Sequence, residues 1–544
     1  MKTSTLEKNP TMGKLATLKV LISDKLSADG IAVLEKAGLS VDLKPGLPEA
    51  ELEKIIGSYD AMLVRSETQV TKKLIEAAKK MKIIGRAGVG VDNIDVEAAT
   101  KAGIIVVNSP EGNTIAASEH TIALIFALAR NIPQAYTTMK NGGWDRSKFT
   151  GNELYQKVLG IIGLGKIGQR VAAIAKTVGM KIVAYDPFAS EQLAKDLGVE
   201  LATLDKIYAE ADFITLHVPK TKETAGMINQ KTFAKMKKGV RIINCARGGI
   251  INEPDLIEAV KSGQVGGAAI DVFETEPANG HPFTGVDKII TTPHLGASTT
   301  EAQVNVAVDV AQQVVNVLTG GEASAPVNIP AMKPEWVAGV KDYLMLAEKL
   351  GILAGQWIEG AIENISIEYL GEIAKKQVAP LTVSVLKGLL TASGRFEQVN
   401  FVNAPIIAKD LKITISETKI EKATDYTNAI HVMIKTAQGK YSFSGSRFEN
   451  IGERVTEIDG FKVNIEPVGN ILLAPNEDRP GVIGQIGTAL GTEKINIASM
   501  IVARQSVGGN ALMVINIDDL ATEAQLKNLS ALKGMRGKIK QISF

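Results

Sequence analysis

The sequence is poor in the residues that build disulfides and metal sites. It has one cysteine, Cys245, in 544 residues, so no disulfide can form within the chain and a metal site made of cysteines is excluded. Histidine is also rare, with five residues, which argues against a zinc cluster. We therefore expect no bound metal.

Neither sign of charge dominates the chain. The 61 Lys and Arg residues against 59 Asp and Glu residues give a net charge of +2. This balance creates no basic field for nucleic acid or for a membrane surface, so we expect neither as a partner.

The chain also lacks a long hydrophobic run. Its most apolar helix-like segment, 115–130, is interrupted by Glu119 and His120 and is too short and polar to span a bilayer. Residues 1–15 are polar and lack the apolar core of a secretory signal, so we expect a disordered tail and a cytoplasmic protein. With 45% hydrophobic and 22% charged residues, the chain is typical of globular proteins, and its length predicts about three or four domains.

A glycine-rich turn is the most informative feature that is present. The apolar run 158–162 leads into a Gly-x-Gly-x-x-Gly turn, a helix-like segment follows over 169–178, and a second apolar run ends at Asp186. In such a β-α-β unit Gly163 permits the tight turn, Gly165 lets the backbone approach a pyrophosphate, and Gly168 lets the helix pack close to the strand. This pattern predicts a dinucleotide site at the helix N-terminus.

Asp186 indicates which dinucleotide is bound. It lies 18 residues after Gly168, at the end of the second strand. A carboxylate there accepts hydrogen bonds from a ribose 2′-hydroxyl and repels a 2′-phosphate. We therefore expect NAD rather than NADP.

The alternation of apolar runs and helical stretches predicts an α/β fold in several parts. We expect a doubly wound (Rossmann) domain inserted in a smaller α/β substrate domain, followed by an α+β domain and a ferredoxin-like βαββαβ module. The helix-like segment 295–320 is expected to return the chain to the first domain. The predicted bounds are 16–108 with 296–328 for the substrate domain, 109–295 for the dinucleotide domain, 331–467 for the third domain and 470–544 for the last.

Three short motifs follow the dinucleotide unit, and each contains a side chain that could take part in catalysis. They contain Arg247, Glu276 and His294, all at or after predicted strand ends. A guanidinium can grip a substrate carboxylate and polarise a 2-keto oxygen, and an imidazole can take a hydroxyl proton as hydride leaves. A carboxylate can orient the imidazole and stabilise its charged form. Together they predict a nicotinamide-dependent dehydrogenase that acts on a 2-hydroxy acid.

The motifs at 65–68, 86–93, 111–114 and 144–146, together with the three above, resemble the D-isomer-specific 2-hydroxyacid dehydrogenases. Over about residues 18–544 the chain is most similar to the long-form members that act on 3-phosphoglycerate. The resemblance implies NAD-dependent oxidation of 3-phospho-D-glycerate to 3-phosphohydroxypyruvate, the first step of L-serine biosynthesis. It also implies a cleft that closes on substrate and the catalytic set Arg247, Glu276 and His294.

The resemblance implies further contacts. Arg146 would reach the partner subunit's site, which implies a dimeric core, and Asn113 would bind the substrate carboxylate from the hinge. The implied substrate-binding residues are Arg65, Ser66, Arg86, Gly88, Gly90, Asn113 and Arg146. The implied cofactor-binding residues are Gly163, Gly165, Lys166, Ile167, Gly168, Asp186, His217, Pro219, Thr224, Ala246, Asp271 and Gly296. Cys245 is expected to be packed and non-catalytic.

The last module resembles an ACT domain, and residues 331–467 resemble the intervening domain of long-form enzymes. Asn476, Asp478 and Asn496 are the implied effector-binding residues, for L-serine or another small molecule. Asn476 and Asp478 replace the His and Asn that the family often has on this loop, whereas Asn496 matches. Pairing of ACT domains would make a tetramer of the dimeric core.

Two alternatives remain open from the sequence. One is a relative that oxidises 2-hydroxyglutarate, glycerate or lactate, and the arginines at 65, 86 and 146 argue against it because an unphosphorylated substrate needs fewer cations. The other is a non-enzymatic NAD-sensing regulator of the same fold.

Overall fold

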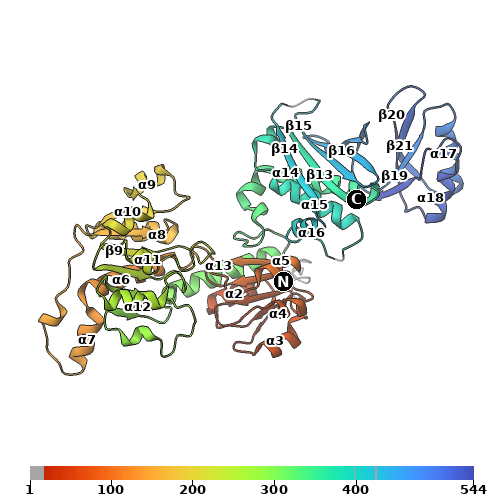
Figure 1. The fold of residues 1–544 in the computed structure, drawn as a ribbon. Helices are drawn as coiled ribbons and strands as arrows, with labels where there is room; N and C mark the ends of the chain where they lie inside the picture. Colours follow the sequence, from red (N-terminus) through yellow and green to blue (C-terminus); the bar gives the residue numbers. More distant parts are fainter. Residues whose placement is uncertain (1–16, 397, 423–424) are drawn as a thin grey trace, which may run out of the picture.

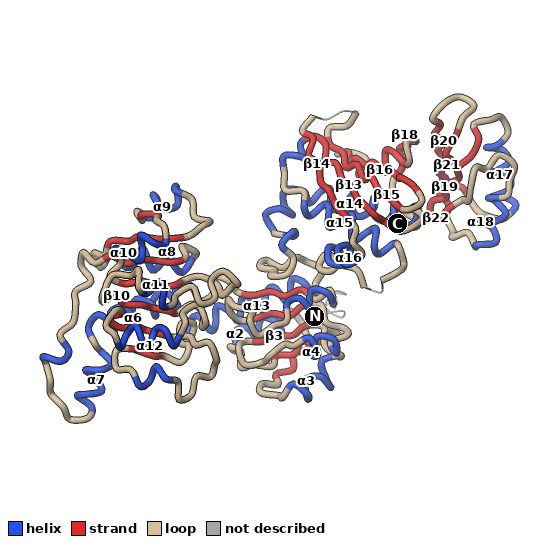
Figure 2. The backbone as a smooth tube through the Cα atoms, viewed as in Figure 1, coloured by secondary structure: helices blue, strands red, loops and turns tan. Residues whose placement is uncertain are grey.

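The structure, a computed structural model, describes residues 17–396, 398–422 and 425–544. The predicted tail at 1–15 lies outside these residues. The chain folds into four separate sheets (Figure 1), and helices pack beside each of them (Figure 2). The mixed α/β architecture confirms the predicted fold class.

The first sheet is parallel and forms what we name the lid domain. Its strand order is β2-β1-β3-β4-β5, with bounds β1 Lys19–Ile22, β2 Ser40–Leu43, β3 Ala61–Val64, β4 Ile83–Arg86 and β5 Ile105–Asn108. One face is covered by α2 (Ala28–Lys36) and α13 (Thr300–Leu318), and the other by α3 (Glu49–Ile56), α4 (Lys72–Ala77) and α5 (Val96–Lys101). The return of α13 to this sheet confirms the prediction that the chain comes back to its first domain.

The sequence analysis missed β2. This edge strand reads Ser-Val-Asp-Leu and keeps partly exposed side chains along its whole length. The other four strands are buried apolar runs that a sequence pattern detects, whereas a short half-polar edge strand carries no such signal.

The second sheet is also parallel and forms what we name the dinucleotide domain. Its order is β12-β11-β10-β9-β6-β7-β8, with bounds β6 Val158–Ile162, β7 Lys181–Tyr185, β8 Glu200–Leu201, β9 Phe213–Leu216, β10 Val240–Asn244, β11 Val265–Ile270 and β12 Ile289–Thr291. This is the doubly wound order, and it changes direction between β6 and β9. Ligands of such sheets bind at the carboxyl ends of the strands beside that change.

Helices cover both faces of the second sheet. The helices α6 (Thr114–Arg130) and α8 (Lys166–Thr177) pack on one face, and α10 (Leu204–Glu210), α11 (Gln230–Phe233) and α12 (Glu253–Lys261) pack on the other. Two more helices, α7 (Ile132–Lys140) and α9 (Glu191–Leu197), lie toward its edges in Figure 1.

The chain crosses between the lid and dinucleotide domains twice. The first crossing joins β5 to α6, and the second joins β12 to α13. The predicted helix start at Leu295 is wrong, because α13 begins at Thr300 with Thr299 as its N-cap. Residues 295–299 form a turn instead, and this turn is part of the site described below.

The third sheet is mixed, with order β14-β13-β15-β16-β17-β18 and bounds β13 Ile362–Gly371, β14 Thr414–Ile420, β15 Asn428–Thr436, β16 Gly439–Phe448, β17 Gly452–Ile458 and β18 Phe461–Ile465. Three helices accompany it: α14 (Pro334–Trp357), α15 (Ala379–Ala392) and α16 (Ala404–Asp410). The sequence predicted an α+β domain here, but its pattern does not reveal α15, which has buried residues on nearly all sides and therefore shows no helical period.

The last sheet has the predicted βαββαβ order. It runs β20-β21-β19-β22, with β19 Asn470–Glu477, α17 Val482–Thr492, β20 Ile497–Arg504, β21 Asn510–Ile517, α18 Glu523–Ser530 and β22 Lys540–Ser543. Alternate residues of β19 serve two cores: Leu472 and Ala474 pack under α17 and α18, whereas Ile471 and Leu473 join the core of the third domain. The last module is therefore packed against its neighbour through a whole sheet face.

A cavity of about 660 Å³ lies where the lid domain, the linker after α13 and the third domain meet. It is lined by residues such as Lys82, Ile105, Ile329, Leu344 and Phe401. Nearby, Asn400 Nδ2 donates to the Gly103 carbonyl at 2.8 Å, which ties the third domain to the lid domain. The cavity is separate from the strand ends that carry the predicted chemistry.

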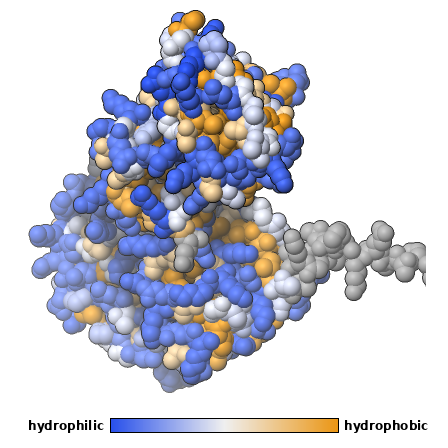
Figure 3. Space-filling model, turned by 90° about the vertical axis from the view of Figure 1, so that its right-hand side faces the viewer, coloured by the Kyte–Doolittle hydropathy of each residue, from blue (hydrophilic) through white to orange (hydrophobic). Residues whose placement is uncertain are grey.

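The face in Figure 3 is mostly hydrophilic, with apolar residues gathered in patches on both its upper and its lower part. Within the described residues, no helix combines the length and apolarity needed to cross a bilayer.

Helix α14 packs against α15 closely enough to require glycine. A Cβ at Gly351 would lie 2.1 Å from the Val385 carbonyl oxygen, whereas a Cβ at Gly339 of the same helix would meet nothing nearer than 4.0 Å. We expect Gly351→Ala to lower the free energy of unfolding of this part by about 1–3 kcal/mol through overpacking. Gly339→Ala is the matched control and should be neutral or stabilising by up to about 1 kcal/mol. Urea unfolding followed by tryptophan fluorescence measures both, because Trp336 and Trp357 lie on α14.

Candidate active site at the domain cleft

A histidine and a glutamate form the centre of the site. His294 Nδ1 lies 2.8 Å from Glu276 Oε2, and Glu276 Oε1 accepts the backbone N–H of Phe273 at 3.0 Å. Burial raises the pKa of Glu276, but the hydrogen bonds from His294 and Phe273 outweigh it, so the pKa lies below its ordinary value. An ionised Glu276 only accepts, so Nδ1 carries the proton and His294 Nε2 keeps a lone pair for a ligand.

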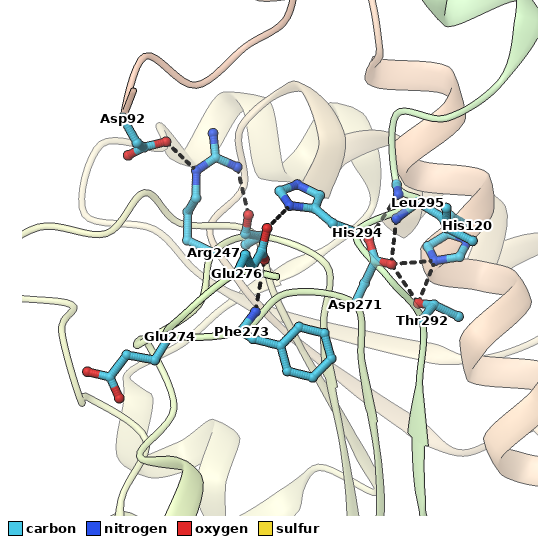
Figure 4. A network of polar contacts seen from close by, with 12 residues as sticks. Asp92, His120, Arg247, Asp271, Phe273, Glu274, Glu276, Thr292, His294 and Leu295 are labelled. Atoms are coloured by element: carbon cyan, nitrogen blue, oxygen red, sulfur yellow. Dashed lines mark hydrogen bonds and ion pairs between the residues drawn. The ribbon is translucent and has the colours of Figure 1, made fainter. Parts of the chain in front are cut away.

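Arg247 joins this pair from the end of β10. Figure 4 shows its guanidinium in one group with Glu276 and His294. Arg247 Nη1 donates to the Ala246 carbonyl at 2.7 Å, and Arg247 Nε lies 3.1 Å from Asp92 Oδ2. Because Asp92 belongs to the lid domain, this ion pair crosses the cleft between the two domains. The structure thus brings together the three predicted catalytic residues.

The lid domain contributes more cations at the same place. Burial and the charges of Arg247 and Arg65 lower the pKa of Arg86 to about 10. A Cβ at Gly90 would lie 2.0 Å from Arg247 Nη2, so the backbone there approaches the guanidinium directly. Mutual repulsion among three guanidinium groups is unfavourable without an anion, so the cluster is suited to a ligand with more than one negative charge.

Several buried polar atoms at the end of β4 and from β5 to the start of α6 have no hydrogen-bond partner among the described residues. These include Arg86 Nε, Ser109 Oγ, Asn113 Oδ1 and Thr114 Oγ1. Unpaired buried polar groups are costly, and they are found where a ligand completes the hydrogen bonding. Arg86 and Asn113 were predicted to contact substrate; Ser109 and Thr114 were not.

The loop 65–68 is held by two further residues, to which the sequence analysis gave no role. Asp24 is buried, and its carboxylate accepts the backbone N–H of Arg65 at 2.5 Å and that of Thr68 at 3.1 Å. Asn93 Nδ2 donates to the carbonyls of Arg65 and Thr68 at 2.8 and 2.7 Å. These contacts join residues far apart in the sequence. Ser66 lies exposed on the same loop, and Gly88 adopts φ +153 beside Arg86.

The glycine turn has the geometry that a dinucleotide needs. Gly163 has φ +98, and a Cβ at Gly168 would lie 2.1 Å from the Gly163 carbonyl oxygen. A Cβ at Gly165 would meet no protein atom within 4 Å, so this residue faces open space at the N-terminus of α8. The N-cap makes no side-chain bond to the first amides of α8, which remain available to a phosphate.

Asp186 lies at the end of β7 beside this turn. Its Oδ2 accepts the Leu164 amide at 2.8 Å and its Oδ1 accepts the Phe188 amide at 2.8 Å. Each carboxylate oxygen has a second lone pair that can accept a hydroxyl group. The residues present therefore fit an adenosine ribose next to the glycine turn.

Most of the other predicted cofactor-binding residues lie after β6, β9 and β10. Burial lowers the pKa of His217 to about 4, and its Nε2 lies 3.0 Å from Thr215 Oγ1. Thr224 Oγ1 donates to the Pro219 carbonyl at 2.6 Å. Ile167 packs into the domain core, Lys166 pairs with Glu111 at 3.2 Å, and Ala246 follows β10.

Asp271 organises the turn that carries His294. It is fully buried at the end of β11, and its carboxylate accepts the amides of Leu295 and Gly296 at 2.8 and 2.9 Å. Burial raises its pKa, but hydrogen bonds from His120 and Thr292, together with that from the Leu295 amide, bring the pKa below its ordinary value. His294 itself has φ +53, a left-handed conformation that costs a non-glycine residue about 1–2 kcal/mol.

His120, Cys245 and Asp271 place one nitrogen, one sulfur and one oxygen within 4.8 Å of one another. Hydrogen bonding accounts for this cluster, because Asp271 already accepts four donors. Burial raises the pKa of Cys245 to about 12, so its thiol stays protonated. The prediction that no metal binds remains a prediction.

Arg146 does not reach the cleft of its own chain. It lies exposed after α7, with its guanidinium 5.8 Å from the centre of the Trp144 ring.

The predicted effector residues lie in the last module, each with a local partner. Asp478 accepts from the Gly508 amide at 2.9 Å and from Arg504 at 3.2 Å, and Asn496 Nδ2 donates to Asp518 at 2.7 Å. Asn476 is buried and donates to the Glu477 carbonyl, while its Oδ1 has no hydrogen-bond partner among the described residues.

Three family patterns match the chain in sequence. Residues 122–296 match the D-isomer specific 2-hydroxyacid dehydrogenase, NAD binding domain; residues 339–459 match the D-3-phosphoglycerate dehydrogenase intervening domain; and residues 476–534 match the ACT domain. The match over 122–296 supports NAD(H) binding at the glycine turn.

Proteins of known name are similar over nearly the whole chain. The D-3-phosphoglycerate dehydrogenase of Synechocystis is 49% identical over 95% of this chain and 93% of its own length. Those of Archaeoglobus fulgidus and Bacillus subtilis are 43% and 42% identical over 95% and 94% of this chain and 98% and 97% of theirs. Among solved structures, the TT0316 protein of Thermus thermophilus (TM-score 0.54, 31% identity) and the D-lactate dehydrogenase of Escherichia coli (0.52, 28%) each cover 57% of this chain and 100% of their own.

The two helix-side glycines of the turn should be separable by experiment. Gly168→Ala places a Cβ against the Gly163 carbonyl, so we expect a lower melting temperature together with NADH affinity reduced about tenfold or more. Gly165→Ala has free space and an ordinary φ of −68, so it should keep the melting temperature yet lose NADH affinity. Thermal unfolding and NADH fluorescence titration measure both variants. Unchanged NADH binding in Gly165→Ala would show that the dinucleotide does not approach this turn.

Proposed function

The chain belongs to the D-isomer-specific 2-hydroxyacid dehydrogenase family, and within it to the D-3-phosphoglycerate dehydrogenases; from this premise we propose how its residues carry out the reaction. It is an NAD-dependent oxidoreductase that converts 3-phospho-D-glycerate to 3-phosphohydroxypyruvate, the first step of L-serine biosynthesis. The observation that carries the proposal is the His294–Glu276 hydrogen bond beside Arg247, at a cleft rich in arginine.

Bound NAD supplies the acceptor for the hydride that leaves carbon 2. His294 takes the proton of the 2-hydroxyl group on Nε2, because Nδ1 is occupied by Glu276. The ionised Glu276 stabilises the imidazolium that results. Arg247 binds the substrate carboxylate and polarises the oxygen as it becomes a keto group. In the reverse direction His294 returns the proton.

The charge of the cleft favours a phosphorylated substrate. Arg65 and Arg86 bring two cations beside Arg247, and the carboxylate and phosphate of 3-phosphoglycerate together need several such donors. We place Asn113 and the backbone of Ser66, Gly88 and Gly90 around the same ligand. A lactate or glycerate would leave part of this positive charge unmatched.

The choice of NAD over NADP is part of the proposal. Asp186 lies beside Gly163–Gly168 with both carboxylate oxygens held by backbone amides, so the charge is fixed in place. A 2′-phosphate at that position would be repelled. His217, Asp271 and Gly296 lie at neighbouring strand ends, where we place the nicotinamide.

We propose that the catalytic core is a homodimer. The segment around α7 exposes several large apolar side chains, at 39–73% of their full exposure: Ile115, Phe126, Ile132, Tyr136, Met139, Trp144 and Tyr155. Such a concentration is typical of a protein interface. It supports the placement of Arg146 in the partner subunit's site, and pairing of ACT domains would give the tetramer.

The ACT domain supports regulation by a small molecule. We propose L-serine as a candidate effector, contacted by Asn476, Asp478 and Asn496. The unpartnered buried Oδ1 of Asn476 is consistent with a ligand near this loop. The single free cysteine fits the cytoplasmic location that we also propose.

The function is tested by measuring NADH formation with 3-phosphoglycerate, glycerate, lactate and 2-hydroxyglutarate, each with NAD and with NADP. We expect the highest kcat/KM for 3-phosphoglycerate with NAD. A higher value for an unphosphorylated acid would support the other dehydrogenases, and no activity with any acid would support a regulator. Titration of L-serine into the same assay tests the effector.

His294 is the first residue to test in that assay. His294→Ala should lower kcat about 10²–10⁴-fold with little change in NADH affinity, because the proton acceptor is lost while the dinucleotide turn is intact. The control is His431→Ala in the third domain, where the imidazole pairs with Glu368 at 3.3 Å. Near-normal turnover of His294→Ala would remove this imidazole from the mechanism.

Asp186→Ala tests the cofactor choice. Loss of the carboxylate removes both the ribose acceptor and the repulsion of a 2′-phosphate, so the ratio of kcat/KM for NAD to that for NADP should fall about tenfold or more. Glu191→Ala, on the neighbouring helix α9, is the control for a general loss of negative charge. An unchanged ratio would contradict the ribose contact.

A further inference from the structure

His120 contacts the catalytic turn although it belongs to a helix outside the triad. It lies on the second turn of α6, and its Nε2 is 3.2 Å from Asp271 Oδ1 and 3.3 Å from Thr292 Oγ1. Figure 4 shows this group beside His294, on the side away from Arg247. Neither the triad nor the dinucleotide turn uses His120.

Asp271, the partner of His120, holds three consecutive amides. Its carboxylate accepts the N–H groups of Leu295 and Gly296, and its backbone carbonyl accepts the N–H of His294 at 2.9 Å. The turn that carries His294 in its left-handed conformation is therefore held mainly by Asp271, with a further bond from the His294 amide to the Thr292 carbonyl at 3.0 Å. Because the carboxylate makes two of the three bonds from Asp271, its orientation bears on the position of the turn that carries His294.

The hydrogen-bond directions assign a donor role to His120. Thr292 donates its only hydroxyl hydrogen to Asp271 Oδ1 at 2.6 Å, so Thr292 can only accept from the imidazole. A carboxylate also only accepts. The Nε2–H of His120 is thus shared between Asp271 and Thr292, and it is the only side-chain donor to this carboxylate besides Thr292 among the described residues.

We propose that His120 is a positioning residue for the reaction: through Asp271 it fixes the turn that presents His294 to the substrate. The inference rests on the proposed role of His294 as acid and base. His120 lies just after the first crossing between the domains, and Thr292 lies just before the second. The contact therefore links the start of α6 with the end of β12, next to the turn that carries His294.

The test compares His120→Leu, His120→Gln and His120→Asn in the full-length enzyme. Leucine removes the donor, so kcat with 3-phosphoglycerate should fall about 10- to 100-fold, while KM for 3-phosphoglycerate changes little because the arginines are untouched. Glutamine places its Nε2–H group at a similar reach and should recover most of kcat. Asparagine is shorter and should not. His431→Leu is the matched control for loss of a carboxylate-paired histidine.

The outcomes distinguish a role of His120 in positioning His294 from a role in folding, and from a failure of the acid/base role proposed for His294. A wild-type kcat in His120→Leu, or equal kcat in the Gln and Asn variants, overturns the inference; the Gln and Asn pair decides the matter if the Leu variant does not fold. A lowered melting temperature with unchanged kcat also overturns it, since the role is then structural only. If His294→Ala keeps its turnover, the acid/base assignment fails instead.

Discussion

The buried carboxylate of Asp271 organises the place where the two catalytic domains meet. It holds the turn 294–296 by side chain and main chain, and it is itself held by Thr292 and His120. A buried charge is stable only when hydrogen bonds replace water, so this carboxylate dictates where its donors must lie. Of those donors, His120 lies just after the first crossing, and Thr292, Leu295 and Gly296 lie at the second.

The two sides of the cleft carry charges of opposite sign. On the dinucleotide side, Glu276 and Asp271 are carboxylates with lowered pKa values, and they hold His294 and the turn that carries it. Across the cleft, Arg65 and Arg86 face Arg247 with too few acids to neutralise them, and Asp92 offers one exposed carboxylate. This imbalance is unfavourable in the free protein and favourable once a dianionic acid enters. The proposed preference of this cleft for a phosphorylated hydroxy acid rests on that difference.

The regulatory half is joined to the catalytic half by packing and not by a flexible link alone. The ACT sheet shares the core of the third domain through alternate residues of β19, and Asn400 ties that domain to Gly103 of the lid domain. These contacts form a route from the ACT domain through the third domain to the lid domain. The cavity at the junction of lid, linker and third domain lies on this route.

The amino-acid sequence by itself determined the glycine turn, the buried strands and the residues at their carboxyl ends, because these depend on local pattern and on the fixed geometry of a parallel sheet. It did not reveal the edge strand β2, whose side chains are partly exposed, or the helix α15, which is buried on nearly all sides, because neither has a periodic pattern of apolar residues. It also did not reveal the turn at 295–299. The partners Asp24, Asp92 and His120 became evident only in the tertiary structure. Each contacts residues far away along the chain, and only the folded backbone brings such distant groups within hydrogen-bonding distance.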